Sequence, residues 1–214
     1  MSLRSRVLEE LGTVYDPELD EPITTLGFVG SCVVTGAGDV SVRLRLPTPQ
    51  CAPNFAFLMA ADAAAAIRRV DGVCSVEVVL TDHYTGAEIN AAVNRGDSFA
   101  DAFPGETRGE LDALRALFQR KALLARQSRL LSEAPKRLGD LTGPDADRCR
   151  ALRRALGIDA SDDAPPFVTG DGVPVAASDV RFRRMASLTA LSLDTNGGMC
   201  RDLLRVRYGE EVAA

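Results

Sequence analysis

The chain has 214 residues, of which 46% are apolar and 26% are charged, and its formal net charge is −5. This is ordinary globular composition, and it excludes an overall basic field that would attract nucleic acid or an anionic membrane. The sequence holds no apolar run of about 18 residues, the length typical of a membrane-spanning helix. The N-terminus leads directly into an amphipathic segment without a signal peptide, so we expect a protein of the reducing cytoplasm.

The first part of the chain predicts alternating helices and strands. Apolar residues at helical spacing or in strict alternation predict these elements, and a glycine-rich turn joins the first two strands. In chain order the helix, two strands, helix and strand are predicted at 4–14, 28–34, 40–46, 53–70 and 73–80. This order predicts a small α+β domain with helices on one face of a sheet, which we place at residues 1–84.

Strand patterns almost disappear after residue 84, which predicts a mainly α-helical extension at residues 85–214. We expect this extension to recognise a partner. The capping-box spacing Thr107–Glu110 opens the longest predicted helix of this region. The segment 96–105 is predicted to be a loop, and 159–175, rich in Pro, Asp and Gly, a linker or surface loop. Helices are predicted at 85–95, 107–131, 145–156, 178–191 and 196–208.

Basic side chains outnumber acidic ones between residues 108 and 154. A solvated face of a helical layer is favoured over an RNA-binding surface, because no aromatic side chains alternate with the basic ones to stack on bases. We therefore expect neither nucleic acid nor a membrane as a partner.

Cys51 is the most informative residue of the chain. It lies in Thr48-Pro49-Gln50-Cys51-Ala52-Pro53, between a predicted strand and a predicted helix. Proline is favourable at the first helical position, so Cys51 is expected close to the positive end of a helix dipole, which favours the reactive thiolate. The alternative is a small hydrophobic residue buried in a turn.

The other four cysteines show no spacing typical of a disulfide framework or a zinc ribbon. Cys32 and Cys74 fall within predicted strands and are expected in the core. Cys149 and Cys200 fall within predicted helices, where structural roles are favoured.

Four motifs follow one another in the first part of the chain. They are Val14-Tyr15-Asp16-Pro17-Glu18, Ile23-Thr24-Thr25-Leu26-Gly27-Phe28-Val29, the turn of Cys51, and Val70-Asp71-Gly72-Val73 before the last strand. In this order and at these separations they resemble the iron–sulfur assembly domain of PaaD and SufT proteins, over about residues 5–82. The helical region is similar to extensions of relatives encoded beside diiron monooxygenase components.

The resemblance places the family's reactive cysteine at Cys51 and its acidic pair at Asp16 and Glu18. A thiolate with two carboxylates offers soft and hard ligands suited to iron. Alternatively, Asp16 accepts hydrogen bonds from local amides in a turn, and the two roles are compatible. The neighbouring Asp20 and Glu21 are also expected to raise a carboxylate pKa.

A single cysteine cannot complete a four-thiolate cluster site. Either two chains share the cluster, or a client supplies the remaining ligands, or binding is transient. His83, the only histidine, lies just beyond the third predicted strand. It is a further candidate metal ligand, with a structural role as the favoured alternative.

The resemblance therefore implies a non-enzymatic maturation factor that transiently holds an iron–sulfur cluster or iron. Its expected partners are a client metalloprotein, such as a diiron monooxygenase component, or other iron–sulfur assembly proteins. A homodimer is also expected as a possible partner arrangement, because one chain supplies a single cysteine to the site. The alternative is an interaction module or chaperone for such a client, in which Cys51 is inert. A thiol-dependent enzyme ranks last because no activating base accompanies Cys51 in the sequence.

Overall fold

The computed structural model describes residues 1–105, 111–133 and 135–209. The chain forms two compact units. The first, called here the sheet unit, comprises residues 1–111 and the segment from Gly197 onward; the second, the helical unit, comprises residues 112–196. In the described residues, no helix is long and apolar enough to cross a membrane.

The sheet unit is built on three strands in the order β1-β2-β3. These are β1 (Val29–Val34), β2 (Asp39–Arg45) and β3 (Ser75–Thr81). A tight turn makes β1 and β2 antiparallel, whereas β2 and β3 run parallel and are connected through helix α2 (Pro53–Arg68). Such a parallel connection needs a crossover, because the chain must return to the end of the sheet where β2 began before β3 can run in the same direction.

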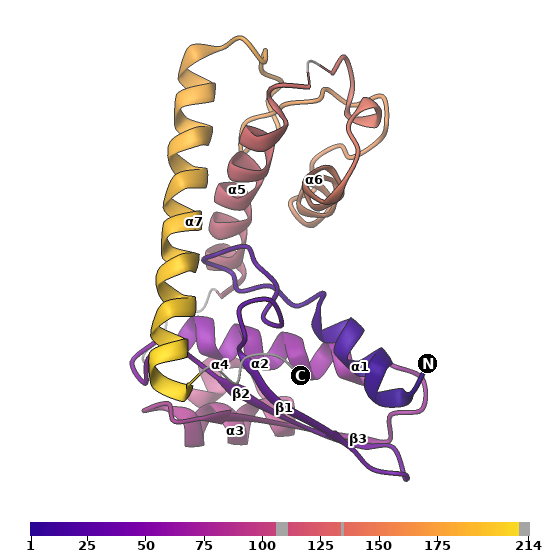
Figure 1. Ribbon diagram of the computed structural model, residues 1–214, viewed down its shortest axis with the longest axis vertical. Coiled ribbons are helices and arrows are strands. Elements are labelled where there is room, and N and C mark those ends of the chain that lie inside the picture. Colours follow the sequence, from indigo (N-terminus) through magenta and orange to yellow (C-terminus); the bar gives the residue numbers. More distant parts are fainter. Residues whose placement is uncertain (106–110, 134, 210–214) are drawn as a thin grey trace. The chain divides into compact units, whose positions relative to one another are not determined.

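The alternation seen in the sequence decides which face of the sheet is buried. Val40, Val42 and Leu44 of β2 are almost inaccessible and share one core with α2 and with α1 (Leu3–Leu11), while the opposite face leaves Val33 and Arg43 exposed. Figure 1 shows α1 and α2 lying along the sheet. The predicted α+β architecture, with helices on one face of the sheet and a mainly helical region after it, is confirmed.

Two side chains of helix α3 (Gly86–Arg95) form hydrogen bonds with backbone groups of β3 on the side of this strand that has no neighbouring strand. The side-chain amide of Asn90 accepts from the N–H of Leu80 at 2.7 Å and donates to its carbonyl at 3.1 Å. Asn94, one turn later, makes the same pair of bonds to Val78 at 2.9 Å each. Two asparagines thus replace a fourth strand and block further strand addition at this edge.

The segment 96–105, predicted as a loop, contains a short helix, α4 (Phe99–Ala102). The loop prediction was wrong because Ser98 and Asp101 form a reciprocal capping box and Phe99 packs on Phe57, with ring centroids 5.4 Å apart. The compact unit therefore extends beyond residue 84. The boundary predicted at residue 84 followed the change from strands to helices. The compact unit instead continues to residue 111 and also includes the segment from Gly197 onward.

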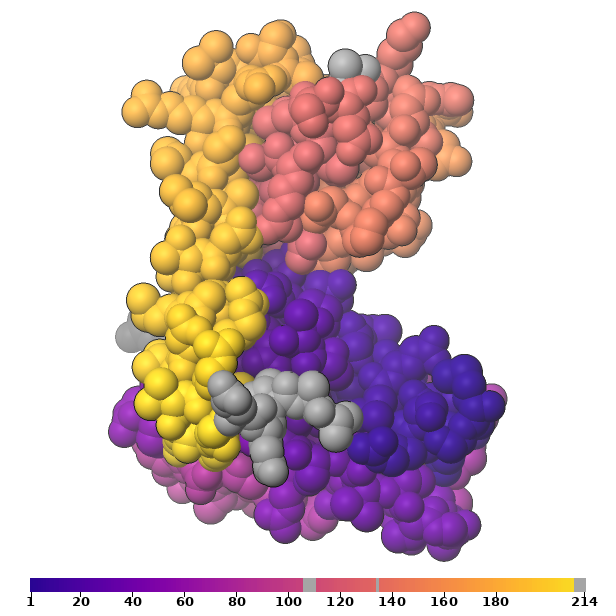
Figure 2. Space-filling view, in the orientation of Figure 1, coloured from indigo at the N-terminus to yellow at the C-terminus, as the bar shows by residue number. Residues whose placement is uncertain are grey.

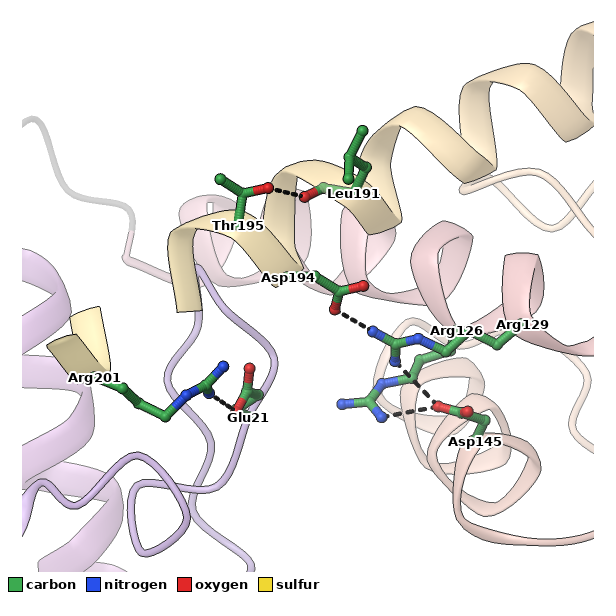
Figure 3. A network of polar contacts seen from close by, with 8 residues as sticks. All are labelled: Glu21, Arg126, Arg129, Asp145, Leu191, Asp194, Thr195 and Arg201. Atoms are coloured by element: carbon green, nitrogen blue, oxygen red, sulfur yellow. Dashed lines mark hydrogen bonds and ion pairs between the residues drawn. The ribbon is translucent and has the colours of Figure 1, made fainter. Parts of the chain in front are cut away.

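The helical unit contains α5 (Leu111–Leu130), the 3-10 turn η1 (Leu138–Asp140), α6 (Pro144–Ala155) and the first part of α7 (Val180–Tyr208). The predicted capping box Thr107–Glu110 lies outside the described residues. Many arginines of this basic region are engaged within the unit. Arg129, for example, pairs with both Asp145 and Asp194, and Arg126 pairs with Asp145 at 2.8 Å (Figure 3).

The segment 159–175, predicted as a linker or surface loop, is irregular but attached to the core of the helical unit. Phe167 and Val168 are buried, and the buried side chain of Gln127 bonds both the N–H and the carbonyl of Val168. The buried guanidinium of Arg153 donates to the carbonyls of Pro165 and Pro166 at 2.9 and 2.8 Å. Composition alone predicted solvent exposure because these long-range bonds have no local sequence signal.

Helix α7 is one continuous helix of 29 residues, not the two helices predicted at 178–191 and 196–208 (Figure 1). The predicted break lay at residues 192–195, just before the pair Gly197-Gly198, and each glycine costs about 1 kcal/mol relative to alanine within a helix. A specific contact explains Gly197: a Cβ at this position would lie 2.6 Å from Oε1 of Glu21. The small residue lets the helix approach that carboxylate closely.

The two glycines form a matched pair for testing this contact. We expect Gly198→Ala to raise the free energy of unfolding by up to about 1 kcal/mol, because nothing lies within 4 Å of its would-be Cβ. Gly197→Ala should lose this gain, since the new methyl displaces the Glu21 carboxylate. Urea denaturation followed by circular dichroism measures the difference. Equal stabilisation by both substitutions would contradict a close approach at Gly197.

Candidate functional site

Cys51 lies in the turn between the end of β2 and the first residue of α2, as the sequence predicts. Helix α2 begins with Ala52 as N-cap and Pro53 as the first helical residue. The Cys51 side chain is half-buried, and its Sγ lies 3.5 Å from Oγ1 of Thr48. Cys51 is therefore neither sealed in the core nor fully open to solvent.

His83 holds the backbone of this turn. Its Nε2 donates to the carbonyl of Cys51 at 2.7 Å, and its Nδ1 accepts from the hydroxyl of Thr85 at 3.1 Å. These two bonds define the tautomer with hydrogen on Nε2. The adjacent N–H of Tyr84 donates to the carbonyl of Pro49, 3.1 Å away. Because both ring nitrogens are engaged, His83 positions the cysteine turn, and metal coordination would require it to give up one bond.

Asp16 accepts hydrogen bonds from local backbone amides in a turn, which was the predicted alternative to a metal-binding role. Its Oδ1 accepts from the backbone N–H groups of Glu18 and Leu19, each at 2.8 Å, and the residue is only 7% exposed. Burial raises the pKa of this carboxyl to about 6, with smaller contributions from the charges of Glu18 and Glu21 and opposition from the two amide bonds. The pKa is raised as expected, but burial is the main cause, and of the two predicted neighbours Glu21 contributes whereas Asp20 is not among the causes.

Cys200 of α7 is a member of this neighbourhood that the sequence assigned to a structural role. Its half-buried thiol interacts electrostatically with Asp16, Cys51 and the exposed carboxylate of Glu18. The local sequence of α7 carries no motif that relates Cys200 to Cys51, so only the long-range packing reveals it. Cys74, expected in the core, is exposed just before β3, whereas Cys32 is buried as expected.

Cys51, Asp16 and Glu18 combine a soft ligand type with hard ones. Thiolates favour iron–sulfur clusters and zinc, and carboxylates favour harder cations. In the part of the chain that the structure describes, no group of three or more His, Cys, Asp and Glu side chains is placed to hold a metal ion. Any metal held here would therefore need further ligands from elsewhere.

The buried Asp16 predicts a specific pH dependence of stability in the metal-free protein. Its pKa of about 6 in the folded chain exceeds the ordinary value of 3.8, so between these pH values the folded state binds more protons than the unfolded state. Stability should therefore fall as pH rises from about 4 to 6, by up to about 3 kcal/mol for a shift of about two units. Below the unfolded pKa the carboxyl is protonated in both states, so this stability is fully present and does not change further with pH.

Asp16→Asn keeps the Oδ1 acceptor but cannot ionise, so its free energy of unfolding should fall less than that of the wild type over this range. Urea denaturation at several pH values measures the difference between the two proteins, with the exposed Asp71→Asn as control. A wild-type pH profile in Asp16→Asn would contradict a raised pKa at this carboxyl.

Comparison with known proteins agrees with the predicted resemblance. Residues 4–78 match the sequence model of a family described as iron–sulfur cluster assembly protein. A protein of Methanocaldococcus jannaschii, described as uncharacterized, is 32% identical over 90 residues, which make up 42% of this chain and 93% of that protein. No solved structure matches the chain.

The matched segment contains β1, β2, α2 and the turn of Cys51, together with Asp16 and Glu18. Such a match supports a general role in iron–sulfur cluster assembly. The residues described above therefore belong to a recognised type of domain, and the chain is a member of the iron–sulfur cluster assembly protein family.

Proposed function

We propose that the protein is a maturation factor that carries iron or an iron–sulfur cluster on Cys51 and passes it to a client metalloprotein. The observation that carries this proposal is the position of Cys51, to which the resemblance assigns the family's reactive cysteine, in a half-buried turn at the start of α2. A carrier must hold its cargo and also release it, which a site with few protein ligands permits.

The surroundings of Cys51 support a carrier in two further ways. His83 and Thr48 fix the turn, so the sulfur is presented from a defined backbone. Asp16 and Glu18, which act electrostatically on Cys200 as Cys51 does, add negative charge that attracts a cation. Neither feature closes the site around a bound metal.

The hydrogen bonds of His83 also support a carrier over an enzyme. A nucleophilic cysteine normally has a base within hydrogen-bond reach of its sulfur. Here the ring of His83 bonds the Cys51 carbonyl and Thr85. The only histidine of the chain therefore supports the backbone of the cysteine and does not activate its thiol.

We further propose a cytoplasmic protein whose partners are a client metalloprotein or other iron–sulfur assembly proteins, with no nucleic acid or membrane partner. A diiron monooxygenase component is the client to test first. A second copy of the chain could supply ligands that the first one lacks. The engaged arginines of the helical unit favour a structural use of this basic region over RNA binding.

Removing the sulfur of Cys51 tests the proposal. We expect Cys51→Ser to bind iron at least about tenfold more weakly after anaerobic reconstitution with ferrous iron and sulfide, since even outer-shell partners of metal ligands cost about 10–100-fold. Visible absorption and bound iron and sulfide are compared with the wild type. Cys74→Ser, which removes an exposed thiol of the same unit, is the control and should load normally.

Loaded wild-type protein is then mixed with the metal-free client, and transfer is followed by iron analysis of the separated proteins. Equal loading of wild type and Cys51→Ser would remove Cys51 from the function. Undiminished client binding together with a failure of wild type to load at all would favour the interaction module or chaperone.

A further inference from the structure

One face of α7 contacts the sheet unit, and Cys200 lies on it. The residues of this face follow one another at helical spacing, because positions three, four, seven and eleven apart share a side of a helix. Leu204 is 1% exposed within the core of the sheet unit, whereas Met199 and Leu203 on the other side are exposed. The inward face consists of Gly197, Cys200, Arg201, Leu204 and Tyr208.

Two sets of polar contacts fix this part of α7, one at each end. At the first end, Nη1 of Arg201 donates to Oε2 of Glu21 at 2.5 Å (Figure 3). The carbonyl of Glu21 in turn accepts from the backbone N–H of Asp16 at 2.9 Å. Figure 2 shows the last turns of α7, in yellow, lying against the N-terminal part of the same unit. The helix is thus attached to the loop that carries Asp16.

At the second end, the helix reaches the chain on both sides of the Cys51 turn. Arg207 donates to the carbonyls of Leu46 and Asp82 at 3.3 and 3.0 Å, and the Tyr208 hydroxyl bonds the Asp82 carboxylate at 3.1 Å. Leu46 leads into the Cys51 turn, and Asp82 precedes the histidine that holds it. Cys200 therefore lies beside Arg201, within the part of α7 that contacts Glu21, and the same helix reaches the chain around the Cys51 turn about two turns later.

The electrostatic environment of Cys200 agrees with this placement. Burial raises the pKa of the Cys200 thiol to about 11, with smaller electrostatic contributions from the Asp16 and Glu18 carboxylates and from Cys51 and a smaller opposing effect of Arg201. The Asp16 and Glu18 carboxylates attract a cation to the same part of the sheet unit.

We propose that Cys200 is a second sulfur ligand of the cargo site, so that Cys51 and Cys200 of one chain hold the metal together. This inference rests on the proposed function. When a divalent ion binds, both thiols release their protons to solvent and two metal–sulfur bonds form. The other coordination positions belong to sulfide or to ligands of a client or second chain, because the described residues offer no closed set of three or more protein ligands.

Cobalt(II) tests this site without an oxygen-sensitive cluster, because its thiolate charge-transfer absorption grows with the number of bound sulfurs. Wild type, Cys200→Ser, Cys51→Ser and the control Cys74→Ser are titrated with Co²⁺ in the full chain. We expect Cys200→Ser to lose about half of the near-ultraviolet absorption and to release one proton fewer per metal than wild type. The Cys74→Ser variant should match the wild type.

A second measurement uses the wild-type chain and so does not depend on how Cys200→Ser folds. Alkylation by N-ethylmaleimide with and without Co²⁺ is followed residue by residue by mass spectrometry. Bound metal should slow alkylation of Cys200 and Cys51 together and leave the exposed Cys74 unchanged.

The outcomes separate this inference from the proposed function. Protection of Cys51 alone, with full absorption and proton release in Cys200→Ser, would overturn the role of Cys200 and leave the carrier function intact. A wild-type chain that binds neither cobalt nor ferrous iron would overturn both.

Discussion

The parallel pairing of β2 with β3 is the constraint on which the candidate site depends. Two parallel strands end at the same edge of a sheet, so the residues that follow them become neighbours. The turn of Cys51 follows β2, and Asp82 and His83 follow β3. The bond between His83 and the Cys51 carbonyl joins residues 32 positions apart, and it exists because α2 returns the chain to the same edge.

Helix α7 adds the second constraint at this edge. The pair of Arg201 with Glu21 joins residues 180 positions apart and depends on a helix that continues through two glycines. Intrinsic propensity argues against that continuity, by about 1 kcal/mol for each glycine. The burial of Leu204 and the contacts of Arg207 and Tyr208 offset this cost. The helix end that carries Cys200 is thus fixed by packing.

Most of the fold could be predicted from local pattern. Strict alternation gave the three strands, helical spacing gave α1 and α2, and proline placed the first residue of α2, since these signals lie within a few neighbouring residues. The turn of Cys51 followed from the same signals, and the family resemblance added Asp16 and Glu18 as candidates. Such features reflect constraints that each segment satisfies within its own length.

Long-range packing established the rest, because it joins segments that carry no joint signal. Neither the loop of Asp16 nor α7 contains a pattern that points to the other, so the place of Cys200 near Asp16 and Cys51 followed only from the folded chain. The burial that raises the Asp16 pKa has the same origin. Local sequence can identify a candidate reactive cysteine. The groups that surround its sulfur depend instead on how distant segments pack at the end of the sheet where β2 and β3 stop.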